Sequence, residues 1–317
     1  MVKFALIGAA GYIAPRHMRA IKETGNDLLV ALDPFDSVGI IDSFFPQADF
    51  FTEPERFDRH LDKLKRKGED SKIDFVSICS PNYLHDSHMR MALRNDANAI
   101  CEKPLVLNPW NIDGLEEIEK ESGRKIFNIL QLRHHPSIVA LKEKFDNLPD
   151  DKIHDIELTY ITSRGKWYFY SWKGDLAKSG GIVTNIGIHF FDMLSWIFGE
   201  VKSNTVHLMQ ENKAAGLLQL KKANVKWFLS LDKNDLPKQA TDKGIPTYRS
   251  ITIDEEELEF SGGFTNLHTV SYQSILKGNG FRVSESRNSI NIVHAIRSSK
   301  PIGLKGDYHS FLKEYVR

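Results

Sequence analysis

The amino-terminal part of this chain repeats one pattern, in which a short apolar run is followed by a stretch with helical periodicity. The first run covers residues 2–7 and is nearly continuous, which is typical of a strand buried on both faces of a parallel sheet. Similar runs follow at residues 28–32, 75–79, 97–101 and 126–130. Strands that alternate with helices in this way predict an α/β fold built on a doubly wound parallel sheet.

The pattern changes after residue 130. A helix predicted at residues 136–145 ends in Asn147-Leu148-Pro149-Asp150-Asp151, a polar segment that indicates a boundary. The strand candidates beyond it alternate between apolar and polar residues, which favours a large open, mostly antiparallel sheet. These candidates cover residues 153–161, 201–210, 214–220, 225–231 and 250–253, with helices predicted at residues 182–198, 265–276 and 283–298.

The chain length also favours two domains, because 317 residues exceed the roughly 100–200 of a typical single domain. We expect an α/β domain at residues 1–135 and an α+β domain at residues 136–317. For the tail at residues 302–317, a short docked helix and a frayed end both remain open.

Composition excludes several classes of protein. The 42 Lys and Arg residues balance 42 Asp and Glu residues, which gives no support to a general nucleic-acid-binding role. We find no apolar run of the roughly 20 residues that span a bilayer, and the amino end begins a strand pattern instead of a signal peptide. Two cysteines, Cys79 and Cys101, supply too few thiols for a disulfide framework or a zinc site. We therefore expect a cytoplasmic protein with reduced thiols and no metal.

A glycine turn follows the first apolar run. Gly8-Ala9-Ala10-Gly11-Tyr12-Ile13-Ala14 stands where the first strand would pass into a helix predicted at residues 13–23. At such a turn, backbone N–H groups and the helix dipole approach a pyrophosphate. The segment departs from the usual G-x-G-x-x-G because Ala10 replaces the second glycine, so the close backbone approach must be arranged differently. The candidate cofactor contacts in this turn are Gly8, Ala10, Gly11, Tyr12 and Ile13.

Asp33 ends the second apolar run, where dinucleotide-binding folds carry the acidic residue that binds the adenosine ribose. A carboxylate there repels the extra phosphate of NADP, and no Arg occurs among the four residues that follow, so we expect NAD. Asp33 could instead only cap a turn. Asp36 and Ser37 are further candidates for the ribose, with capping of a helical stretch from Val38 as the alternative.

Two more turns follow the third and fourth predicted strands, whose carboxyl ends form the ligand-binding edge of such a sheet. The first carries Ser80, Asn82 and His85, and the second is Glu102-Lys103-Pro104. Pro104 disfavours a helical conformation at Lys103 and so holds it extended. Desolvation beside a cofactor lowers a lysine pKa from about 10.4 toward neutrality, which suits proton transfer. The alternative is an ordinary surface lysine.

In the second half, Gly180-Gly181 precedes a predicted helix in which Asn185 and His189 share one face, four residues apart. A polar pair among apolar neighbours indicates a site, although a buried histidine bonded to a carbonyl is the structural alternative. These motifs, in this order, resemble the Gfo/Idh/MocA oxidoreductases. The resemblance implies an amino-terminal Rossmann domain that binds NAD and a carboxyl-terminal open-sheet domain that binds substrate and forms oligomer contacts. It also implies Lys103 and His189 as the catalytic pair, with Asn185 where many members have Asp.

A narrower resemblance is carried by residues 128–135, 160–168, 171–175 and 230–237, which are similar to the UDP-N-acetyl-2-amino-2-deoxyglucuronate dehydrogenases. It implies oxidation of the carbon-3 hydroxyl of a UDP-linked aminouronic acid to a 3-keto sugar for lipopolysaccharide O-antigen synthesis. It further implies reoxidation of NADH by 2-oxoglutarate in one branch, a homo-oligomer with a tetramer favoured over a dimer, and Gln131 near the cofactor.

The substrate that this resemblance implies carries several negative charges, and the sequence contains a cluster of cationic residues suited to binding them. Arg164, Lys166 and Lys173 lie among aromatic residues that include Tyr168. The expected substrate contacts are Lys103, Arg164, Tyr168, Lys173, Asn185 and His189. Three alternatives stay open: a charged hairpin at an exposed sheet edge, a family member that oxidises a free sugar or polyol, and a noncatalytic NAD-binding sensor or assembly protein.

Overall fold

The computed structural model of the chain describes residues 1–149, 152–258 and 266–316. It has two compact units, Met1–His134 with Thr265–Arg287, and His135–Phe264 with Asn288–Arg317. The chain first passes from one unit to the other after His134, one residue before the expected boundary after residue 135. The contiguous division into residues 1–135 and 136–317 did not include the return of the chain to the first unit. Asp150, Asp151 and Thr265, which belong to predicted segments, and the tail residue Arg317 lie outside the described residues.

The first unit contains a parallel sheet of six strands in the order β3-β2-β1-β4-β5-β6, which confirms the predicted doubly wound fold. The strands are β1 (Lys3–Ile7), β2 (Asp27–Leu32), β3 (Asp49–Phe51), β4 (Phe75–Ile78), β5 (Asn98–Cys101) and β6 (Ile126–Asn128). Only β3 was not predicted, because three residues with an exposed Asp49 show no apolar run. The strand order reverses between β1 and β4, so the ligand-binding edge lies at their carboxyl ends.

Helices between these strands pack on the sheet through one apolar stripe each. They are α1 (Ala14–Glu23), α2 (Pro54–Arg66), α3 (His85–Arg94) and α4 (Pro109–Ser122). In α2, Phe57 and Leu61 are buried and most of the charged side chains are exposed. Both cysteines are free and buried.

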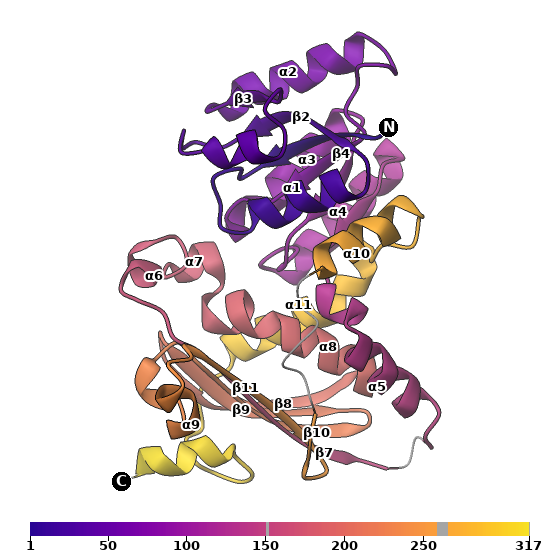
Figure 1. Cartoon of the computed structure of the whole chain (residues 1–317). Helices are drawn as coiled ribbons and strands as arrows, with labels where there is room; N and C mark the ends of the chain where they lie inside the picture. The colour runs from indigo at the N-terminus through magenta and orange to yellow at the C-terminus, as the bar shows by residue number, and fades with distance from the viewer. Residues whose placement is uncertain (150–151, 259–265, 317) are drawn as a thin grey trace. The chain divides into compact units, whose positions relative to one another are not determined.

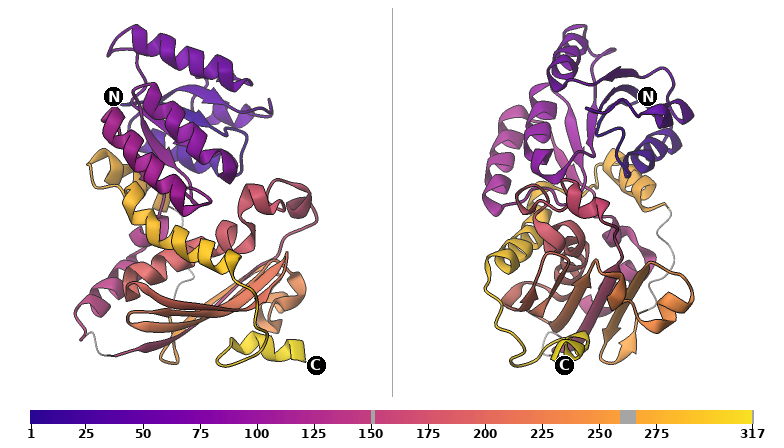
Figure 2. Two further views of the ribbon diagram at one scale, coloured as in Figure 1. Left: turned by 180° about the vertical axis from the view of Figure 1, so that it is seen from behind. Right: turned by 90° about the vertical axis from the view of Figure 1, so that its left-hand side faces the viewer.

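Helix α10 (Leu267–Leu276) explains why the chain returns to the first unit. In Figure 2 this orange helix lies beside the indigo and purple elements of the first unit. Tyr272 on α10 is fully buried, and its ring centroid lies 5.7 Å from that of Phe4 on β1. The first core is therefore completed by a residue that lies far away in the sequence.

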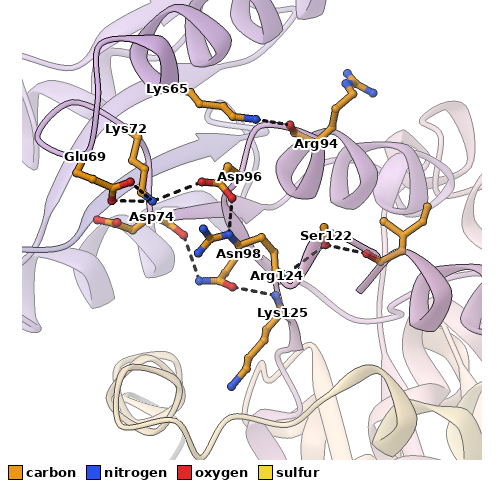
Figure 3. Close-up of polar contacts among 11 residues, drawn as sticks. Lys65, Glu69, Lys72, Asp74, Arg94, Asp96, Asn98, Ser122, Arg124 and Lys125 are labelled. Carbon is orange, nitrogen blue, oxygen red and sulfur yellow. Dashed lines mark hydrogen bonds and ion pairs between the residues drawn. The ribbon is translucent and has the colours of Figure 1, made fainter. Parts of the chain in front are cut away.

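Ion pairs connect the loops at the amino ends of the strands, opposite the ligand-binding edge (Figure 3). Lys72, just before β4, has its Nζ 2.8 Å from Glu69 and 3.4 Å from Asp96. Asp96, just before β5, also binds Arg124 at 2.6 Å. These contacts stabilise the end of the sheet that carries no candidate site residue.

The second unit contains a sheet of six strands in the order β12-β11-β7-β10-β9-β8 (Figure 1). Its strands are β7 (His154–Thr162), β8 (Val201–Met209), β9 (Lys213–Leu220), β10 (Ala223–Ser230), β11 (Thr247–Ile253) and β12 (Glu256–Glu257). All neighbours are antiparallel except β7 and β10, so the predicted mostly antiparallel sheet is confirmed. The central strands match the predicted alternating runs to within three residues at their ends.

The two faces of this sheet have different partners. One face carries helices α5 (Pro136–Asp146), α8 (Ile188–Phe198) and α11 (Arg287–Ser298), while the carboxyl-terminal segment, in yellow, lies on the other (Figure 1). In β10, the Trp227 ring lies 5.3 Å from Phe191 of α8, and the next residue, Phe228, packs against Leu312. Successive strand residues point to opposite faces, so β10 holds both layers. Of the two alternatives for the tail, docking is the one observed.

The stretch Leu176–Phe198 corrects one expectation. It combines α7 (Leu176–Ser179), an irregular turn and α8, and it is long and apolar enough to span a membrane by composition alone. However, 78% of its most apolar window is buried inside the protein. Gly187 explains the close packing, because a Cβ there would meet Leu229 of β10 at 2.7 Å. The segment is the core helix of the second unit.

Candidate active site

The glycine turn is held close to two strands. Gly8 has a φ of +88°, and a Cβ at this residue would lie 2.6 Å from the carbonyl carbon of Cys79. Its N–H donates to Leu32 O at 2.8 Å, and Gly11 N–H donates back to Gly8 O at 3.0 Å. Only glycine combines this conformation with this approach to the end of β4. The turn ends at Ile13, the N-cap of α1, and Tyr12 is exposed.

Asp33 is buried at the end of β2 and joins the glycine turn to the following loop. Its Oδ2 accepts the N–H of Ala10 at 2.9 Å, and its Oδ1 accepts the N–H of Phe35 at 2.9 Å. The capping role weighed for Asp33 is therefore present, and each carboxylate oxygen retains acceptor capacity for a ribose hydroxyl. Asp36 and Ser37 are exposed, and the N-cap of the following 3-10 turn is Val38, without a side-chain cap.

The turn after β4 is built around His85, at the start of α3. Its Nδ1 lies 2.7 Å from Pro104 O and its Nε2 lies 2.9 Å from Ser80 O. Burial lowers the pKa of His85, although both carbonyls oppose that shift. Ser80 Oγ bonds His88 Nδ1 at 2.8 Å, and Asn82 is buried in the same turn. His85 thus joins the Ser80 turn to the Lys103-Pro104 turn.

Lys103 follows β5, and its backbone is fixed by the residue before it. Lys103 N–H donates to Glu102 Oε2 at 3.2 Å, while Glu102 N–H donates to Ile78 O at 3.0 Å. Glu102 is buried, Lys103 is half-buried, and the Lys103-Pro104 peptide bond is cis. The two turns are brought together at the carboxyl ends of adjacent strands, as the sequence predicted.

The predicted cofactor contact Gln131 follows β6, and Arg133 lies two residues further on. Gln131 is half-buried, and its Oε1 is a buried acceptor without a hydrogen-bond partner among the described residues. Such an orphaned acceptor is uncommon and fits a ligand group that is a donor. Arg133 has a different environment: its Nη1 lies 3.4 Å from Glu285 and its guanidinium 5.1 Å from the Phe281 ring centroid, all within the first unit.

In the second unit, the predicted polar pair lies on an irregular part of the helix. Val183–Gly187, which includes Asn185, forms a π-helical turn, and His189 lies in the first turn of α8. Gly180 and Gly181 both have positive φ before it. Single π turns occur often at functional sites because they change the direction of side chains. Asn185 is buried, and His189 is half-buried.

Arg164, Tyr168 and Lys173 lie between β7 and α8, near Asn185. Asn185 Nδ2 donates to Tyr168 Oη at 2.7 Å, and Tyr168 belongs to α6 (Trp167–Tyr170). Lys173 Nζ lies 4.3 Å from the Trp172 ring centroid. Burial lowers the pKa of Lys173, and the charge of Arg164 lowers it further. The structure thus groups two cations, aromatic rings and a polar pair in one unit.

Residues 230–237 support this group. Arg164 N–H donates to Leu231 O at 3.0 Å. Asp235 binds both Lys213, at 3.0 Å, and Ser230, which anchors the loop. His17 and His268, which contact Glu102, could not be predicted as its partners because they lie on helices distant in sequence and belong to no motif.

Comparisons with known proteins agree with this geometry. Residues 2–129 match the family model described as GFO_IDH_MocA, "Oxidoreductase family, NAD-binding Rossmann fold", and residues 151–234 match its "C-terminal alpha/beta domain". A curated relative, the uncharacterized oxidoreductase YgjR of Escherichia coli, is 26% identical over 64% of this chain. That match spans 60% of the relative's own length.

Two solved structures are more similar. Both are of the WlbA (WbpB) dehydrogenase of Thermus thermophilus, one in complex with NAD and alpha-ketoglutarate and one with NAD and UDP-GlcNAcA. The first has a TM-score of 0.95 and 50% identity, and the second a TM-score of 0.94 and 49% identity. Each comparison covers 98% of this chain and 100% of the other. The chain therefore belongs to the Gfo/Idh/MocA oxidoreductase family, as its motifs predicted.

Proposed function

We propose that the chain is an NAD-dependent dehydrogenase that oxidises the carbon-3 hydroxyl of UDP-N-acetyl-2-amino-2-deoxy-D-glucuronate to the 3-keto sugar. The observation that carries this proposal is the 49% identity, over 98% of the chain, to a WlbA dehydrogenase solved with NAD and UDP-GlcNAcA. That similarity covers both units, so it includes the cofactor-binding and substrate-binding candidates together.

The first unit fits NAD. The glycine turn lies between β1 and α1, where dinucleotide-binding folds hold a pyrophosphate, and buried Asp33 repels the extra phosphate of NADP. Gln131 supplies the orphaned acceptor. When bound, NAD accepts the hydride from the sugar. His85 and Glu102 would shape the site through the contacts described above. The proposed cofactor-binding residues are Gly8, Ala10, Gly11, Tyr12, Ile13, Asp33, Asp36, Ser37, Ser80, Asn82, His85, Glu102, Lys103 and Gln131.

The second unit fits the sugar nucleotide. Arg164 and Lys173 provide positive charge for a diphosphate and a uronate, and the aromatic side chains beside them can pack on flat or apolar ligand surfaces. Asn185 and Tyr168 form a buried pair that offers hydrogen bonds to sugar hydroxyls. A free polyol carries no negative charge for these cations to bind, so the free-sugar alternative is less well supported.

For the chemical step we propose that Lys103, or His189 with Lys103 assisting, removes the proton of the substrate hydroxyl. Both side chains are titratable and half-buried, which suits proton transfer. Lys103→Met and His189→Asn are each expected to reduce the rate of the chemical step by about 100-fold or more. A variant with full activity would remove that residue from the catalytic pair.

We further propose that NADH is reoxidised by 2-oxoglutarate, since the same relative was solved with alpha-ketoglutarate. A cytoplasmic homo-oligomer, with a tetramer favoured over a dimer, and a role in O-antigen synthesis belong to the same proposal. Light scattering at micromolar concentration tests the assembly, and a monomeric mass would contradict it.

A substrate panel tests the proposed function. Purified protein would be incubated with NAD and, in turn, the UDP-linked aminouronic acid, the free aminouronic acid and myo-inositol. We expect NADH to form with the UDP-linked acid alone. Turnover of a free sugar instead would favour the free-sugar dehydrogenase, and tight NAD binding without any turnover would favour a noncatalytic protein.

A further inference from the structure

A buried polar network surrounds Glu102 in the first unit. Glu102 Oε1 lies 2.9 Å from Nε2 of His17 and 2.9 Å from Nε2 of His268. His17 is fully buried, and Glu102 and His268 are 6% and 4% exposed. Burial alone would raise the pKa of Glu102, but the hydrogen bonds from both histidines outweigh burial and hold it well below its ordinary value. The carboxylate is therefore ionised in the protein interior.

A neutral His17 allows one consistent direction for the hydrogen bonds around it. Its Nδ1 lies 2.8 Å from Tyr272 Oη, and Tyr272 Oη lies 2.6 Å from Ser77 Oγ. A neutral imidazole donates from one nitrogen and accepts at the other. If His17 donates Nε2–H to Glu102, its Nδ1 accepts from Tyr272, and Tyr272 accepts from Ser77. Each of these donors then has an acceptor, and burial lowers the pKa of His17 in favour of this neutral form.

The other oxygen of Glu102 connects this network to Lys103. Glu102 Oε2 accepts the Lys103 N–H at 3.2 Å, and His85 holds Pro104 O at 2.7 Å on the other side of the lysine. His17 comes from α1, which begins at the glycine turn, and His268 comes from α10. Two helices from opposite ends of the chain thus converge on the carboxylate that precedes the proposed catalytic lysine.

We propose that His17 and His268 are positioning residues for Lys103. They fix the Glu102 carboxylate, and Glu102 then fixes the Lys103 backbone through its N–H. We expect the charge of this adjacent carboxylate to favour the ammonium form of the lysine. The role given to Lys103 rests on the proposed function, whereas the network itself does not. One potential ligand atom from each of His17, Glu102 and His268 lies within 4.8 Å of the other two, a geometry that a metal ion also accepts. The complete donor-to-acceptor chain favours hydrogen bonding.

The test measures Lys103 without any sugar. Competitive acetylation at a series of pH values, followed by peptide mass spectrometry, gives the titration midpoint of the Lys103 amine. His268→Leu removes one donor, so the buried Glu102 gains a proton and its charge no longer favours the ammonium form. We expect the midpoint to fall by about one pH unit in His268→Leu and to return close to wild type in His268→Gln, which restores an N–H donor.

The kinetics of the same variants provide the second measurement. We expect kcat to fall about tenfold or more in His268→Leu, with the Kd for NAD changed less than about twofold, and partial recovery in His268→Gln. His60→Leu, on α2, is the matched control and should change neither the midpoint nor kcat. If His268→Leu does not fold, His17→Leu removes the other donor to Glu102 and should shift the midpoint in the same direction.

An unchanged Lys103 midpoint in a folded variant would overturn the proposal, even if its melting temperature fell. One equivalent of zinc per chain in the purified wild-type protein would also overturn it, because the cluster would then be a metal site. A wild-type protein that oxidises no sugar nucleotide would contradict the proposed function alone, since the acetylation midpoint would still test the network.

Discussion

The backbone N–H of Ala10 donates a 2.9 Å hydrogen bond to Oδ2 of Asp33, so one carboxylate organises both the glycine turn and the end of β2. Asp33→Ala removes this acceptor and the charge proposed to bind the ribose. We expect the Kd for NAD, measured by calorimetry, to rise about tenfold to a hundredfold, the range for hydrogen bonds to a charged group.

A second substitution separates the two roles of Asp33. Asp33→Asn keeps an acceptor for Ala10 but loses the charge, so it should bind NADP better than the wild-type protein does. The exposed Asp42 is the control, and Asp42→Ala should leave both affinities unchanged. Equal NAD affinity in Asp33→Ala and wild type would exclude Asp33 from the cofactor site.

Gly8 should tolerate no side chain. In Gly8→Ala the Cβ would lie 2.6 Å from Cys79 C in a residue with a φ of +88°, so we expect a loss of about 1–3 kcal/mol in the free energy of unfolding. Gly39→Ala is the control, because a Cβ there meets nothing within 4 Å. Urea unfolding measures both, and equal midpoints would contradict the close approach of the turn to β4.

Arg164 and Lys173 should bind the nucleotide sugar without affecting NAD. Each change to Ala is expected to raise KM for the UDP-linked substrate about tenfold, because each removes one charge-assisted contact. Lys202→Ala removes an exposed lysine of β8 and should leave KM unchanged. If the double variant keeps the wild-type KM, the two cations belong to an ordinary charged surface.

His309 should make stability depend on pH. Its ring is fully buried with Nε2 3.0 Å from Thr159 Oγ1, and burial lowers its pKa to about 4, although Glu157 opposes the shift. The unfolded chain, with a histidine pKa near 6.5, binds more protons between these values. The free energy of unfolding should therefore fall as pH decreases from about 6.5 to about 4.

A non-titrating residue tests this contribution. His309→Gln should reduce the slope of stability against pH in that window without abolishing it, because burial also lowers the pKa of His88 to about 4. Lys313→Gln, at an exposed neighbour, should leave the slope unchanged. An identical slope in His309→Gln and wild type would show that this histidine is not buried in its neutral form.

Much of the fold was predictable because its signals are local. Continuous apolar runs identified the buried parallel strands, and alternation identified strands such as β10, where Phe228 and Leu229 must point to opposite faces. Strands β3 and β12 were missed because two or three residues are too short for any period. The return of α10 to the first unit depends on packing between Tyr272 and Phe4, residues that no local pattern connects.

The residues of the candidate site were also predictable only where their signals are local. The turns with Lys103 and Asp33 follow strands, so position along the sheet identified them. The buried partners of Glu102 could not be found in this way, because His17 and His268 look like ordinary helix residues until three-dimensional packing brings them together. Arg133, two residues after Gln131, bonds Glu285 within the first unit, a partner that no local pattern predicts.

The most direct test of the proposed activity is the mass of the sugar nucleotide after incubation with the protein and NAD, with and without 2-oxoglutarate. The account predicts that UDP-N-acetyl-2-amino-2-deoxy-D-glucuronate loses the mass of two hydrogen atoms. Sustained conversion only with 2-oxoglutarate would show cofactor recycling. An unchanged mass under both conditions, with a protein that binds NAD, would contradict the proposed activity.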